Sequence, residues 1–206
     1  MPTFARYAAW IGAACCAAAV VGFAAALDGY AHDRHPLGLL GAMSIPRAGI
    51  FNLLGFILPG LLLTLVAWFA RSRAAGIAGR LVGIGGWLLL LSAVAFAAQG
   101  LLPLDPDELQ GRQSQLHATA WSLWWIAFVP GALMLAAGLA RGPGGRVAGL
   151  LMLACAIVVL LAALPPLLLP GPVWQRIGLG GWLLAYLVVA SAGRRATFGP
   201  TLAGAG

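Results

Sequence analysis

Two of the three histidines follow the first long apolar run and lie close to an aspartate. Asp28 precedes His32 by four residues, and His32 precedes His35 by three. If the first helix continues for two more turns, these spacings place all three side chains on one face. Because neutral imidazole and carboxylate are donors that hold zinc, the spacing predicts a metal site there.

A second polar stretch, residues 101–117, holds the other three acidic residues and ends at the last histidine. If it lies beside the first, the two could complete one site. The candidate metal ligands are His32, His35 and His117, and the candidate catalytic acids are Asp28 and Asp105. A zinc ion with an open position lowers the pKa of bound water to about 7, so the chemistry would be metal-assisted hydrolysis of lipid or acyl bonds.

The same residues have a simpler interpretation, which we favour. The chain holds no HExxH motif and no other strong metal-binding spacing. Polar residues between apolar spans solvate helix ends, and Asp28 could form an ion pair with Arg47 or Arg176 at the rim. The spacing alone therefore leaves both the metal site and the structural role open.

The composition indicates which class of protein contains these residues. Hydrophobic residues make up 62% of the chain and charged residues only 8%. A bilayer core needs about 20 helical residues to cross it, and six apolar runs reach or approach that length. They are residues 8–27, 49–69, 81–99, 118–140, 147–169 and 177–191. Residues 1–206 are therefore expected to form one all-α transmembrane domain, a six-helix bundle.

Arginine accounts for all twelve basic residues, and its distribution predicts the orientation of the bundle. Eight arginines flank the span ends on the side of the two termini, and four lie on the other side. Because loops rich in arginine stay cytoplasmic, both termini are expected inside a bacterial inner membrane. The arginines are dispersed at helix ends, so the net charge of +7 indicates contact with lipid headgroups and not with nucleic acid. The sequence leaves open whether the protein forms a homo-oligomer.

Prolines and tryptophans within the spans suggest further roles. Pro59 predicts a kink in the second span, and Pro130 lies in a similar motif about 70 residues later, which favours a repeat and a small transporter. Trp121, Trp124 and Trp125 gather near one end of the fourth span. They predict a lipid-facing aromatic belt or, as the alternative, the wall of an outward-facing pocket.

Several short motifs occur in a characteristic order between Asp28 and Trp182. They are HPLGLLGA, FNLLGFILPG, GLLPLDPDE with SQLHA, and WQRIGLGGW. In this order the chain resembles the bacterial and archaeal six-helix membrane family called domain of unknown function 998. The resemblance implies six transmembrane helices and no assigned activity. It marks Asp105 and His117 as matching positions, whereas Gly38 stands where members typically have serine, so a mechanism that uses that hydroxyl is not expected here.

Three functions are thus compatible with the sequence. A non-enzymatic, lipid-interacting membrane protein is favoured because no strong catalytic motif occurs. A metal-assisted hydrolase at the outer leaflet is the first alternative, and convergence of the three histidines would support it. A small transporter is the second, and a cavity lined by Pro59 and Pro130 would support it.

Overall fold

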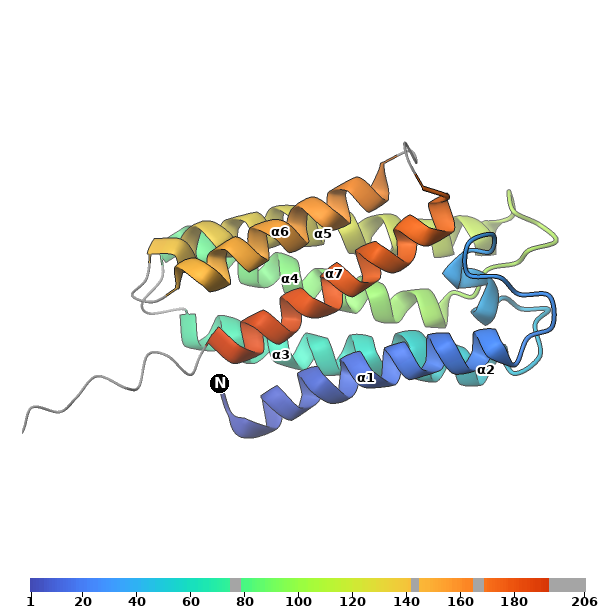
Figure 1. Ribbon diagram of the computed structural model, residues 1–206, viewed down its shortest axis with the longest axis horizontal. Helices are drawn as coiled ribbons and strands as arrows, with labels where there is room; N and C mark the ends of the chain where they lie inside the picture. Colours follow the sequence, from blue (N-terminus) through green and yellow to red (C-terminus); the bar gives the residue numbers. More distant parts are fainter. Residues whose placement is uncertain (75–78, 142–144, 165–168, 193–206) are drawn as a thin grey trace, which may run out of the picture.

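Six long apolar helices run side by side in the computed structural model, which describes residues 1–74, 79–141, 145–164 and 169–192 (Figure 1). Each is long and apolar enough to cross a membrane, so the predicted all-α six-helix transmembrane bundle is confirmed. The elements are α1 (Thr3–Ala25), the 3₁₀ helix η1 (Leu37–Gly41), α2 (Ala48–Phe51), the π-helix η2 (Asn52–Ile57), α3 (Leu58–Ala74), α4 (Gly79–Leu101), α5 (Arg112–Arg141), α6 (Arg146–Ala163) and α7 (Gly171–Ala192). Together α2, η2 and α3 make the second span.

Several helix ends differ from the predicted bounds, because the local backbone conformation sets where a helix stops. Helix α1 ends at Ala25, and Gly29 adopts a left-handed φ of 75° shortly afterwards. Asp28 is therefore in a turn, and the prediction that it shares a helix face with the two histidines that follow is wrong. Helix α6 ends early because Leu164, which precedes a proline, is extended. Helix α5 begins at Arg112, six residues before its predicted start.

Aromatic side chains of α7 fill the middle of the bundle. Trp182 and Tyr186 are fully buried. The Trp182 indole donates to Ser92 Oγ at 3.0 Å, and the Tyr186 hydroxyl donates to the Leu89 carbonyl. Phe96 packs against Trp182 with ring centroids 4.4 Å apart. Helix α4 thus satisfies the polar atoms of α7, as a core without water requires.

The second span is irregular just before its proline. Pro59 lacks an N–H and crowds the carbonyl four residues earlier, and the preceding turn is the π-helix η2. Gly60 follows and packs directly against α4. A Cβ atom at Gly60 would lie 2.7 Å from both the Cβ and the backbone nitrogen of Ala97. The span can approach α4 this closely only because position 60 has no side chain.

The two ends of the bundle carry different residues. The N terminus and the last residues of α7 lie at one end (Figure 1). At the other end lie the loop 26–47, the loop 102–111 and the start of α7 (Figure 1). We call this the histidine end, because all three histidines and all five acidic residues are there.

Candidate functional site

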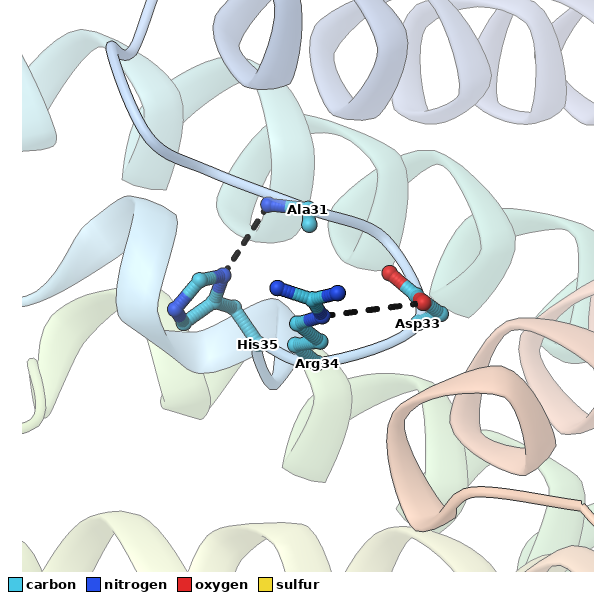
Figure 2. A network of polar contacts seen from close by, with 4 residues as sticks. All are labelled: Ala31, Asp33, Arg34 and His35. Atoms are coloured by element: carbon cyan, nitrogen blue, oxygen red, sulfur yellow. Dashed lines mark hydrogen bonds and ion pairs between the residues drawn. The ribbon is translucent and has the colours of Figure 1, made fainter.

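His32 and His35 are tied into the loop 26–47 by separate contacts. His35 Nδ1 accepts a hydrogen bond from the Ala31 backbone N–H at 2.9 Å (Figure 2). His32 Nδ1 accepts one from Nε of Arg176, on α7, also at 2.9 Å. Each ring has thus committed its Nδ1 lone pair to a hydrogen-bond donor of the protein.

Arg176 holds this loop against α7. Its Nη2 donates to the Tyr30 hydroxyl and, at 3.1 Å, to the His35 carbonyl. The Tyr30 hydroxyl donates in turn to the Pro36 carbonyl at 3.2 Å. Burial raises the pKa of the Tyr30 phenol, although Arg176 acts to lower it. The phenol therefore keeps the proton that it donates.

Two further hydrogen bonds hold η1 in place at the histidine end. The Leu37 backbone N–H donates to Gln175 Oε1 at 3.1 Å, which joins the loop to α7. Asn52 Nδ2 donates to the Gly41 carbonyl at 2.9 Å, and Asn52 is buried. The 3₁₀ helix is thus anchored at both of its ends, over the space between α4, α5 and α7.

His117 lies below η1, in the second turn of α5, and is 8% exposed. Its Nδ1 is 2.8 Å from the Leu102 carbonyl oxygen, and the Gln99 carbonyl also interacts with the ring. A carbonyl only accepts, so Nδ1 carries the hydrogen, and Nε2 of the neutral ring is an acceptor. Nε2 faces Gly38, where a Cβ atom would lie only 2.9 Å away. Glycine at position 38 leaves this nitrogen uncovered.

A cavity of about 210 Å³ opens at this point. Its walls come from the loop 26–47, η2, α4, α5 and α7, and they are mostly apolar or aromatic. The lining residues are Pro36, Leu37, Gly38, Phe56, Phe96, Gln99, Leu104, His117, Ala118, Trp121, Trp124, Gln175 and Leu179. Pro36 and Ala118 are exposed, so the cavity reaches the surface between the loop and α5.

Comparison of the chain with protein families, with curated proteins and with solved structures finds no match in any of the three. The resemblance to domain of unknown function 998 stays a prediction. The structure itself bears on the three functional interpretations through the cavity and the residues around it.

The predicted metal centre is not found in the part of the chain that the structure describes. No group of three or more His, Cys, Asp or Glu side chains there could hold a metal ion. His117 lies under η1, whereas His32 binds Arg176 of α7 and His35 binds the Ala31 N–H, so the three do not converge on one metal position. The transporter interpretation is not supported either, because neither Pro59 nor Pro130 lines the cavity.

The two candidate catalytic acids, Asp28 and Asp105, lie in loops and do not line the cavity. Asp105 Oδ1 accepts from the Asp107 N–H at 3.1 Å, and the Asp105 carbonyl accepts from Ser114 Oγ at 2.8 Å. Asp28 is exposed. Among the described residues, the one ion pair joins Arg34 to Asp33 at 4.0 Å (Figure 2), so Asp28 does not form the predicted pair.

Trp121 and Trp124 are walls of the cavity. Trp124 is 5% exposed and packs between Phe96 and Trp182. The favoured prediction of a lipid-facing belt is therefore wrong for Trp124, and the alternative of a pocket wall holds. Trp124 points inward because α5 packs against α4, and its ring reaches Trp182 of α7.

Gln99 is the functional residue that sequence reasoning missed. It is 3% exposed, it lines the cavity, and its Nε2 has no hydrogen-bond partner among the described residues. The Nε1 atom of Trp124 is likewise buried and unpartnered there. A buried donor without an acceptor costs about 1 to 3 kcal/mol. A signal was present, since Gln99 ends an otherwise apolar span and polar residues within spans are costly.

Replacing Gln99 by leucine is expected to stabilise the empty protein by about 1 to 3 kcal/mol, because it removes the unpaired donor and keeps the side-chain volume. Unfolding in mixed micelles, followed by circular dichroism, measures the change. The matched control is Gln115→Leu, whose exposed amide already donates to the Gln110 carbonyl and should give no gain. Destabilisation by Gln99→Leu would mean that the amide is satisfied within the protein.

Proposed function

We propose that this multi-pass membrane protein binds a small amphiphilic lipid in the cavity at the histidine end. The observation that carries the proposal is the unpartnered amide of Gln99 in a cavity whose walls are otherwise mainly apolar. Ligand sites combine such walls with a few polar groups that orient the ligand. A lipid with a polar head would use both kinds of surface.

Binding is a better account of this cavity than catalysis. The described residues that line it include no aspartate, glutamate, cysteine or serine. His117 is the sole titratable group among them, and a hydrolytic site would pair it with a nucleophile or a second acid. The proposed function is therefore non-enzymatic, in agreement with the interpretation that the sequence favours.

We place the cavity on the extracytoplasmic side of a bacterial inner membrane. The support is the arginine distribution, because the order of the spans assigns eight of the twelve arginines to the side of the N terminus. Ala118 lies at the opening and only six residues from the start of α5. A lipid that enters there would keep its head near the membrane surface and its chain along the aromatic walls.

Replacing Ala118 by phenylalanine is expected to remove bound lipid, because the ring would obstruct the opening. Native mass spectrometry of protein purified from membranes in a mild detergent measures lipid occupancy. The control is Thr119→Phe, which places the same ring at an exposed neighbour that does not line the cavity. The proposal predicts one lipid per chain in the parent and in the control, and little in Ala118→Phe. Equal occupancy in all three would contradict it.

A further inference from the structure

We infer that the lipid bound in this cavity is uncharged and carries both a free hydroxyl and a carbonyl group, as a monoacylglycerol does. The inference rests on the proposed function and specifies its ligand. It follows from the hydrogen-bonding groups that the cavity leaves unused and from the absence of charge among the described residues that line it.

The hydroxyl is inferred from His117, which offers an acceptor in the cavity. Its Nδ1–H is committed to the Leu102 carbonyl, so Nε2 can only accept. The backbone of Gly38 passes close to Nε2 but offers it no side chain. Aromatic and aliphatic neighbours such as Phe56 offer no strong donor. An O–H or N–H group of a ligand in the cavity would therefore find an acceptor in this nitrogen.

The carbonyl is required by two donors in the same cavity. Gln99 Nε2 and Trp124 Nε1 are buried and have no acceptor among the described residues. Gln99, Trp124 and Phe96, which contacts the Trp124 ring, all line this cavity. An ester or amide carbonyl has two lone pairs and can accept from one or both donors. Since His117, Gln99 and Trp124 line one cavity of about 210 Å³, we expect hydroxyl and carbonyl to lie near each other in the ligand, as they do in an acylated glycerol.

An uncharged head is favoured because the cavity offers no counter-ion. No arginine or acidic residue occurs among its described lining residues. The guanidinium of Arg176, at the start of α7, donates hydrogen bonds to Tyr30, His32 and the loop backbone. A carboxylate or phosphate buried here would be desolvated without a cation, and that is costly.

The test compares four lipids that share an eighteen-carbon chain but differ in the head. Monooleoylglycerol has both groups, oleyl glyceryl ether lacks the carbonyl, methyl oleate lacks the hydroxyl, and oleate is an anion at about pH 8. Competition against radiolabelled monooleoylglycerol on the purified protein gives relative affinities. We expect monooleoylglycerol to bind about tenfold more tightly than each of the other three, because each lost hydrogen bond leaves a buried group unpaired.

A variant links this preference to the cavity. In Gln99→Leu the preference for the ester over the ether should fall to about threefold, since one of the two donors to the carbonyl is gone and Trp124 Nε1 remains. The control Gln115→Leu should keep the tenfold preference. Similar affinities for all four lipids in the parent, or tightest binding of oleate, would overturn the inference and leave lipid binding intact. Binding of none of the four, together with equal lipid occupancy in the Ala118→Phe test, would overturn the proposed function as well.

Discussion

Replacing Gly60 by alanine is expected to destabilise the protein by about 3 kcal/mol, through overpacking of the contact between α3 and α4. The new methyl group would lie 2.7 Å from the Ala97 Cβ and backbone nitrogen, and 2.9 Å from the Ala93 carbonyl oxygen. Two of these three atoms belong to the backbone, so a rotamer change cannot relieve the clash. Unfolding in mixed detergent micelles, followed by circular dichroism, gives the free-energy difference.

Gly83→Ala is the matched control for that substitution. Gly83 lies in α4, and a Cβ atom there would meet no heavy atom within 4 Å. Since alanine favours a helix by up to about 1 kcal/mol over glycine, this variant should be as stable as the parent or more stable. Equal destabilisation by the two substitutions would show that the close approach of α3 to α4 at Gly60 does not explain the effect.

Replacing Arg176 by leucine is expected to free the loop at the histidine end. The guanidinium donates to Tyr30, His32 and the His35 carbonyl, and a hydrogen bond from a charged donor contributes about 1.5 to 3 kcal/mol. Loss of about 2 kcal/mol would increase local opening about thirtyfold. Hydrogen exchange of the Leu37 amide, which donates to Gln175 beside Arg176, reports this opening.

The same substitution should weaken lipid binding, because Pro36, Leu37 and Gly38 form one wall of the cavity. Arg112→Leu is the control. Arg112 is exposed at the same end of the bundle and makes no side-chain hydrogen bond to the rest of the described chain. Exchange at Leu37 that is unchanged in Arg176→Leu would mean that η1 is held by its other contacts alone.

The six helices could be predicted from the sequence because membrane thickness sets the length of the apolar runs. Apolar runs mark the hydrocarbon core, but helices continue into polar residues beyond it. Arg112 to His117 thus belong to α5 although they are mostly polar, and the position of His117 inside this helix was not predicted. The location of all histidines and acids at one end followed from counting spans, since alternate loops emerge on alternate sides.

The contacts of the site could not be read from spacing. Leu37 and Gln175 are 138 residues apart, and their hydrogen bond depends on how α7 packs against the first loop. The spacing of Asp28, His32 and His35 suggested shared ligands only on the condition that α1 continued, and its end at Ala25 removes that condition. The sequence does not distinguish Gln99 as a cavity residue, because a single polar residue at a span boundary is common in membrane helices.

The π-helix η2 allows the second span of this chain to lose one residue. A π-turn contains one residue more than an α-turn needs, so losing one residue from Asn52–Ile57 would restore a regular helix without shifting α3. Because the residue lost is the extra one of the π-turn, side chains on both sides of it keep their orientation around the helix axis. Asn52 would still donate to the Gly41 carbonyl if the deletion falls after it. A chain shortened in this way should therefore keep both its six spans and the anchor of its first loop.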